Sequence, residues 1–299
     1  VPFFSCTERL SVAALGILHS LSKMIPSTHS RTYIIHAARH YFNTLCSRIF
    51  QKNILTDISK YDKLFTKYCV WGISMMSVLA ANKVTYIYQS KYQKVQALTE
   101  VSCGFEAGKF YAIVGQSGSG KTTLLSMLAG LGTPNEGEVL SNGKSVKEVG
   151  SERHRRENVS VIYQAFNLFP TLNLLENVMY PMQIQKVPKA EAKSRAKELL
   201  GLVGLGEVDP RKLPAMLSGG QQQRVAIARA LASSAPVILA DEPKDNLDSE
   251  NGENIIALLK GLTKEENRCV IIVTHDMGIA AQADVVYRMM DGRLEEETL

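Results

Sequence analysis

The spacing of apolar and polar positions predicts short strands that alternate with helices from about Lys83 onward. Runs rich in β-branched and aromatic residues, typical of strands, occur at Val84–Tyr88, Ala97–Phe105, Phe110–Val114, Val159–Tyr163, Val237–Ala240, Cys269–Val273 and Val285–Met289. Apolar positions at helical spacing occur at Thr122–Leu131, Lys189–Val203, Gly220–Ala232, Ser249–Leu262 and Met277–Ala283. This alternation predicts an α/β fold with a largely parallel sheet.

Two segments do not follow the alternation. Residues 166–217 show helical patterns without a clear strand, which predicts a helical insert. Residues 1–76 contain apolar patches such as Leu10–Leu21 but no clear element boundaries. The longest apolar run, Cys69–Ala81, is shorter than the ~18 residues that a membrane-spanning helix needs. We therefore expect no helix that crosses a bilayer.

The positive charge of the chain is concentrated at its N-terminal end. The chain has 299 residues and a formal net charge of +5. Residues 1–76 contain nine Lys or Arg against three acids, whereas residues 77–299 contain 25 basic and 26 acidic residues. Because the larger part is near neutral, we expect no nucleic-acid partner. Five cysteines without CxxC spacing argue against a disulfide framework or a zinc site and favour a reducing compartment.

The same change in charge suggests a domain boundary. We interpret residues 77–299 as one domain and residues 1–76 as an extension. Met75 and Met76 stand at the boundary, so our hypothesis is that translation starts at one of them. Residues 1–74 would then be upstream sequence read through in frame or a dispensable extension. The alternative is a genuine basic arm that lies on anionic lipid.

A glycine-rich loop follows the strand predicted at Phe110–Val114. The segment Gly115–Thr122 matches the phosphate-loop pattern G-x-x-x-x-G-K-[ST], with a helical pattern behind it as the motif requires. Glycines let successive backbone N–H groups point into one concavity, and the helix N-terminus adds positive potential. We expect Lys121 to reach the β- and γ-phosphates of a nucleotide and the Thr122 hydroxyl to bind Mg²⁺.

Two adjacent carboxylates, Asp241 and Glu242, end the apolar strand at Val237–Ala240. In open α/β sheets, ligands bind at the C-terminal ends of the strands. Asp241 suits the Mg²⁺ shell, and Glu242 could polarise an attacking water. Alone, the pair could equally be an acidic cap between strand and loop. The phosphate loop earlier in the chain favours the catalytic interpretation.

A third motif begins at Ser218, where Ser-Gly-Gly opens a helical pattern. This would be a second helix N-terminus with exposed backbone amides, and so a second phosphate-binding surface. The spacing alone is equally consistent with an ordinary serine N-cap.

Taken together, GQSGSGKTT, LSGGQQQR and VILADEP make the chain resemble the ATP-binding cassette (ABC) ATPases from about Ser77 to the C-terminus. The resemblance implies a P-loop NTPase cassette with a RecA-like core, an N-terminal antiparallel β subdomain and a helical subdomain at about residues 166–217. It implies ATP and Mg²⁺ as cofactors, and a homodimer in which two cassettes pair head to tail.

The resemblance also assigns roles to single residues. Those implied to bind ATP are Tyr88, Gly115, Gln116, Ser117, Gly118, Ser119, Gly120, Lys121, Thr122, Thr123 and Gln164. Those implied to hold the metal are Thr122, Gln164 and Asp241, and the catalytic pair is Glu242 and His275. Asp248 belongs to the D-loop, and the signature residues that would act on the partner's γ-phosphate are Ser218, Gly219, Gly220 and Gln221. Tyr86 and Tyr92 remain alternatives to Tyr88 for stacking on adenine. Gln164 could be a plain strand-end amide, and His275 an ordinary histidine.

Residues 164–170 and 176–181, together with the Ser90–Val95 insertion, are similar to one branch of this family. It serves macrolide exporters, lipoprotein-release complexes, peptide-resistance systems and the FtsE-like cell-division cassette. The resemblance implies an ATPase on the cytoplasmic face of the membrane that powers a separate permease for export or extrusion. The alternative is an FtsE-like regulatory cassette whose partner transmits force without transport. A soluble ABC protein of translation or DNA repair is disfavoured, because one cassette is present and no long coiled coil interrupts it.

The chain departs from the family pattern directly after Glu242. The family commonly shows Pro-Thr-Gly/Ser-x-Leu-Asp, whereas this chain reads Pro-Lys-Asp-Asn-Leu-Asp, with Lys244 and Asp245 in place of two small residues. The catalytic pair is intact, so we expect hydrolysis to be retained and the coupling through this loop to be altered.

Overall fold

The computed structural model describes residues 77–90 and 93–297. The hypotheses about residues 1–76, and the candidate Tyr92, lie outside the described residues. Within the described part of the chain, no helix is both long and apolar enough to cross a membrane.

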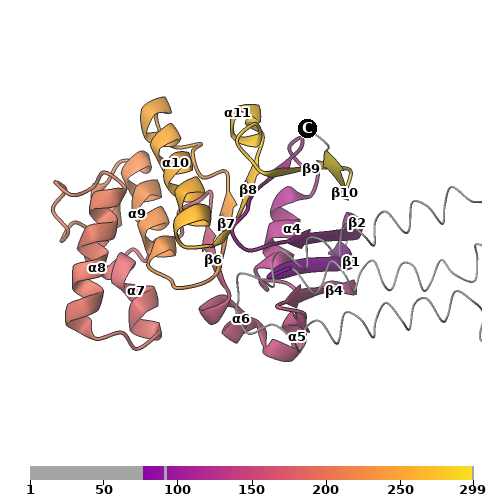
Figure 1. The fold of residues 1–299 in the computed structure, drawn as a ribbon, viewed down its shortest axis with the longest axis horizontal. Helices are drawn as coiled ribbons and strands as arrows, with labels where there is room; N and C mark the ends of the chain where they lie inside the picture. The colour runs from indigo at the N-terminus through magenta and orange to yellow at the C-terminus, as the bar shows by residue number, and fades with distance from the viewer. Residues whose placement is uncertain (1–76, 91–92, 298–299) are drawn as a thin grey trace, which may run out of the picture. The chain divides into compact units, whose positions relative to one another are not determined.

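The main sheet has six strands in the order β10-β9-β3-β8-β7-β6 (Figure 1). They are β3 (Phe110–Val114), β6 (Val159–Ile162), β7 (Val237–Asp241), β8 (Cys269–Thr274), β9 (Val285–Met290) and β10 (Arg293–Glu297). Neighbouring strands from β6 to β9 are parallel, and only β10 runs antiparallel to its neighbour. The expected α/β fold with a largely parallel sheet is confirmed.

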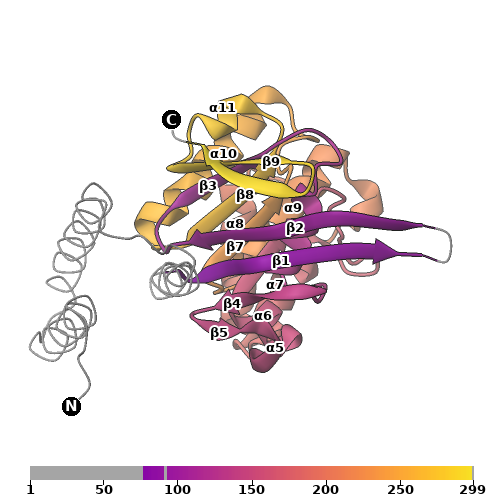
Figure 2. The same cartoon turned by 90° about the vertical axis from the view of Figure 1, so that its right-hand side faces the viewer.

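A second, antiparallel sheet has the order β2-β1-β4-β5. Its strands are β1 (Leu79–Gln89), β2 (Lys94–Phe105), β4 (Glu136–Ser141) and β5 (Lys144–Ser145), and Figure 2 shows β1 and β2 as a long pair. The apolar pattern did not predict β4 and β5, because β4 has a single buried apolar residue, Val139. Pairing with β1 defines β4, rather than its own composition.

The helices cover both faces of the main sheet. They are α4 (Lys121–Leu128), α5 (Val146–Val149), α6 (Ser151–Glu157), α7 (Leu174–Ile184), α8 (Lys189–Leu202), α9 (Gly219–Leu231), α10 (Ser249–Glu265) and α11 (Met277–Ala280), with a 3-10 turn at Pro214–Met216. Along β8, Val270 and Ile272 face a core shared with α7 to α10. Ile271 and Val273 face the opposite core, which includes α4 and the antiparallel sheet. This alternation explains why the strand is apolar throughout.

Two helices end earlier than their apolar patterns predict. Helix α4 ends at Leu128 and not at Leu131, because Gly130 adopts a left-handed φ of 65°. Leu131 N donates to Ser126 O, and Gly130 N donates to Met127 O, which is the Schellman arrangement of a helix end. Helix α11 ends at Ala280 and not at Ala283, where the chain turns into β9.

The segment predicted as a helical insert contains α7, α8 and the 3-10 turn, and no strand. Helices α7 and α8 pack against α9, so this helical layer continues into the helix that begins at the Ser-Gly-Gly motif. Asn173 caps α7 through a reciprocal capping box with Glu176. Asn177, fully buried one turn later, donates its Nδ2 to three carbonyl oxygens of the preceding loop and accepts from Phe169 N.

Candidate active site

Three loops meet at the C-terminal edge of the main sheet. Gly115, Glu242 and His275 directly follow β3, β7 and β8, which are consecutive neighbours in the sheet. Parallel strands end at the same edge, so the topology gathers residues that are more than a hundred positions apart in sequence.

The phosphate loop is closely enclosed by neighbouring backbone. A side chain at Gly115 would lie 2.3 Å from Met289 O, and one at Gly120 would lie 2.6 Å from Ala97 O. Gly120 also has a φ of 107°, which L side chains rarely adopt. These two glycines are therefore required by the packing of the loop as well as by its approach to an anion.

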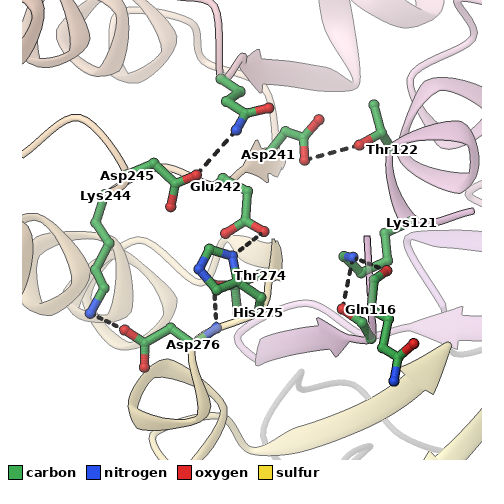
Figure 3. Close-up of polar contacts among 12 residues, drawn as sticks. Gln116, Lys121, Thr122, Asp241, Glu242, Lys244, Asp245, Thr274, His275 and Asp276 are labelled. Carbon is green, nitrogen blue, oxygen red and sulfur yellow. Dashed lines mark hydrogen bonds and ion pairs between the residues drawn. The ribbon is translucent and has the colours of Figure 1, made fainter. Parts of the chain in front are cut away.

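The ammonium group of Lys121 folds back onto the phosphate loop. Its Nζ donates to the carbonyl oxygens of Gly115 and Gln116, at 2.9 Å each (Figure 3). The side chain is 8% exposed, so its charge is held inside the loop. Within the same loop, Ser119 Oγ is buried and has no hydrogen-bond partner among the described residues. A buried cation and an unpaired hydroxyl at one loop fit an anion with several oxygen atoms.

Thr122 and Asp241 form the candidate cation site. Thr122 Oγ1 and Asp241 Oδ1 lie 3.3 Å apart (Figure 3). Asp241 is 6% exposed, and burial raises the pKa of its carboxyl group, while the hydrogen bond from Thr122 acts in the opposite direction. A buried carboxylate beside a hydroxyl supplies the hard oxygen ligands that Mg²⁺ prefers. These residues therefore fit a divalent cation.

Glu242 and His275 are joined by a hydrogen bond. His275 Nδ1 lies 2.9 Å from Glu242 Oε1 (Figure 3). Glu242 has a left-handed φ of 45°, and its N–H donates to Val273 O on the neighbouring strand. The hydrogen bond to Glu242, with further attraction from nearby carboxylates, raises the pKa of His275. The strained backbone of Glu242 is held by β8, which also presents His275.

Gln164 follows β6 and reaches the same group of residues. Its Nε2 donates to Asp245 Oδ2 at 3.1 Å. One oxygen or nitrogen atom of each of Glu242, Asp245 and His275 lies within 4.8 Å of the others. Asp245 is therefore part of the site, although its only sequence signal was the departure from the family pattern.

Tyr88 lies near the start of α4. Its hydroxyl is 3.3 Å from Thr123 Oγ1, and half of the side chain is exposed, at 50%. Tyr86 packs edge-on against it, with ring centroids 4.9 Å apart. Tyr88 is thus the exposed ring of the pair beside the phosphate loop, which supports it over Tyr86 as the residue that stacks on adenine.

The signature motif lies at the N-terminus of α9. Ser218 caps the helix in a reciprocal capping box with Gln221, so the ordinary N-cap interpretation holds for the isolated chain. A side chain at Gly220 would lie 3.1 Å from Asn246 O. No hydrogen bond or ion pair joins Ser218, Gly219, Gly220 or Gln221 to the phosphate loop within the described residues. Asp248 likewise caps α10 through Asn251 and does not reach the other predicted site residues.

The comparisons with known proteins agree with this architecture. The family described as ABC transporter matches residues 98–245. The ABC transporter ATP-binding protein YclH of Bacillus subtilis is 42% identical over 217 residues, which are 73% of this chain and 95% of that protein. The lipoprotein-releasing system ATP-binding protein LolD of Chromohalobacter salexigens is 42% identical over 223 residues, which are 74% of this chain and 94% of that protein.

Solved structures support the same assignment. The dimeric post-hydrolysis state of the cassette MJ0796 of Methanocaldococcus jannaschii, bound to ADP and Pi, has a TM-score of 0.71 and 38% sequence identity. The match spans 74% of this chain and 98% of the MJ0796 chain. The chain therefore belongs to the ABC transporter ATP-binding family. It is an ABC ATPase, with the P-loop NTPase cassette fold that the sequence predicted.

Proposed function

We propose that the chain is the ATP-hydrolysing subunit of an export or extrusion system and powers a separate membrane permease. The observation that carries this proposal is the division of the site. Lys121, Asp241 and Glu242 lie near one another (Figure 3), whereas within the described residues no hydrogen bond or ion pair joins Ser218 to the phosphate loop. A second copy would supply Ser218 and Gly220 to the γ-phosphate, which makes ATP part of the dimer interface.

The residues of one chain would divide the work of phosphoryl transfer to water. Lys121 leaves its carbonyl partners to bind the β- and γ-phosphates, and the loop amides hold the remaining oxygens. Thr122, Asp241 and Gln164 would hold Mg²⁺, which neutralises charge on the phosphates. Glu242 accepts a proton from the attacking water, and His275 orients Glu242 from the exposed side. Positioning and electrostatics would supply most of the rate.

The rim of the helical subdomain around Phe166–Pro181 is the proposed contact with the permease. Phe169 and Tyr180 lie partly exposed on it, with ring centroids 4.5 Å apart and the Arg229 guanidinium 5.8 Å from the centroid of Phe169. Arg229 also donates to the carbonyls of Phe166 and Asn167, so it fixes the loop that leads from Gln164. Through this contact the cassette would be held peripherally at the cytoplasmic face of the membrane.

Relatives named for lipoprotein release are consistent with export. The alternative is an FtsE-like cassette whose partner transmits force without transport. Reconstitution with a candidate permease from the same source tests the proposal. We expect ATPase activity to rise on reconstitution, and to fall back when both Phe169 and Tyr180 are changed to Ala. Cargo movement that depends on Glu242 supports export, whereas a stimulated ATPase without cargo movement supports the regulatory alternative.

A further inference from the structure

The loop after Glu242 reaches two other loops of the site through two charged residues. Asp245 Oδ2 accepts a hydrogen bond from Gln164 Nε2 at 3.1 Å, and the Lys244 ammonium forms an ion pair with the Asp276 carboxylate. In Figure 3, Asp245 turns toward Glu242, while Lys244 extends away to Asp276. The loops that follow β6, β7 and β8 are therefore connected through this one segment.

Asp245 determines whether the side-chain nitrogen or the side-chain oxygen of Gln164 faces it. An ionised carboxylate only accepts hydrogen bonds, so the amide group must direct its nitrogen at Asp245. The oxygen of Gln164 is then turned away from Asp245 and is the atom left for another partner. A hard divalent cation binds amide oxygen and not amide nitrogen. The family pattern has a small residue at position 245. Such a residue would not determine which way the Gln164 amide group is turned.

Lys244 holds the same loop from its other side. The aliphatic part of its side chain lies against Gly252 of α10, and both Lys244 and Asp276 are only partly exposed, at 33% and 28%. Asp276 is fixed in turn, because its Oδ1 accepts from Gly278 N at the start of α11. The loop is thus held by an ion pair at Lys244 and by a hydrogen bond at Asp245.

We propose that Asp245 is a positioning residue for the ATP site, which turns the oxygen of Gln164 toward the divalent cation, with Lys244 holding the loop in place. The proposal rests on the role given above to Gln164 as a cation ligand. It goes beyond that role because it assigns a function to the two residues in which this chain departs from the family pattern.

The test is a set of variants at two positions, measured without turnover in the full chain with Glu242→Gln. The dissociation constant of a fluorescent ATP analogue is measured with and without Mg²⁺. The ratio of the two dissociation constants gives the gain in affinity due to the cation. We expect Asp245→Ala to reduce this gain by on the order of 10-fold, the scale for losing a residue that orients a metal ligand. Asp245→Asn should reduce it as well, because an Asn amide can donate to the Gln164 oxygen as readily as it accepts from the Gln164 nitrogen.

The combined variant separates positioning from other effects. Gln164→Ala should reduce the gain to a similar extent, and Asp245→Ala should have no further effect in the Gln164→Ala background. Glu253→Gln, a change of an exposed acid on α10, is the matched control and should leave the gain unchanged. The ratio does not depend on the fraction of folded protein, so modest destabilisation does not obscure the result.

The outcomes distinguish this inference from the proposed function. If Gln164→Ala reduces the gain and Asp245→Ala does not, the inference is wrong and the role of Gln164 stands. If Asp245→Asn keeps the full gain, a side chain that only accepts hydrogen bonds is not needed at position 245, which also contradicts the inference. If Gln164→Ala has no effect, both the role of Gln164 and the inference fail.

Discussion

His275 Nδ1 lies 2.9 Å from Oε1 of Glu242, so the exposed imidazole closes over a carboxylate whose own side chain is only 11% exposed. The two residues directly follow the neighbouring strands β7 and β8, and the N–H of Glu242 donates to Val273 O on β8. Glu242, the proposed catalytic base, is therefore held at its backbone by the sheet and at its side chain by His275.

Changing Glu242 to Gln should preserve ATP binding and abolish most of the turnover. The substitution keeps the size and one hydrogen-bonding oxygen of the side chain but removes the base, which costs on the order of 10² or more in rate. Phosphate release under saturating MgATP measures the loss. Because opening of the proposed dimer would follow hydrolysis, gel filtration with MgATP should show an accumulated dimer. Near-normal turnover, or a monomer at saturating ATP, contradicts the role given to Glu242.

The described part of the chain contains two histidines, His154 and His275. The pKa of His275 should lie above the ordinary histidine value of about 6.5, and the pKa of His154 should lie below it. The hydrogen bond to Glu242 raises the pKa of His275, and burial lowers the pKa of His154, which is fully buried. Proton NMR titration of the imidazole resonances measures both. Glu242→Gln should return His275 toward its ordinary pKa and leave His154 unchanged.

The raised pKa of His275 determines how the contribution of this residue to the free energy of unfolding changes with pH. A raised pKa in the folded state means that the His275–Glu242 interaction is fully present below about pH 6.5 and is lost as the pH rises through the raised value. The difference in the free energy of unfolding between wild type and His275→Gln should therefore shrink with rising pH. A difference that grows over this range contradicts the assignment.

Asn177→Ala should destabilise the helical layer without changing nucleotide binding. Asn177 is fully buried and makes four hydrogen bonds with the backbone of the loop before α7. Removing its amide group leaves buried backbone groups unpaired, at a cost of about 1–3 kcal/mol. Urea unfolding measures the change, and Asn254→Ala, on the exposed side of α10, is the control. A cost equal to that of Asn254→Ala would show that the loop does not depend on Asn177.

The apolar pattern predicted the five parallel strands of the main sheet, β3, β6, β7, β8 and β9, because most of their residues are buried. Continuous apolar runs such as Cys269–Val273 are recognisable without knowledge of their partners, since each strand contacts a core on each side. The pattern missed β4, β5 and β10, which are polar segments defined by pairing with a neighbouring strand. It predicted C-terminal ends for α4 and α11 that lie beyond the observed ends, which are set by local turns.

For the site, motif spacing gave the residues but not their contacts. Gly115–Thr122 and Asp241 are local signals, and the parallel topology brings them together. Asp245 and Lys244 could be noticed only as a departure from a family pattern, because their partners, Gln164 and Asp276, lie on other loops. Sequence alone could not pair them, since these contacts depend on how three loops meet in space.

In the proposed dimer, each ATP site is completed by a second chain. Ser218→Arg should leave nucleotide binding intact and block dimerisation, because a bulky cation would lie where helix amides must approach the γ-phosphate. Lys121→Ala should abolish phosphate binding by its own loop. Neither variant alone should hydrolyse ATP at an appreciable rate.

Phosphate release by a mixture of the Ser218→Arg and Lys121→Ala chains is the most direct measurement. In a mixed dimer, one site combines an intact Lys121 with an intact Ser218, and the other site loses both. We predict that mixing restores part of the wild-type activity, and that a chain with both substitutions restores none when mixed with either single variant. If the activity of the mixture equals the sum of its separate components, the site is not shared between two chains.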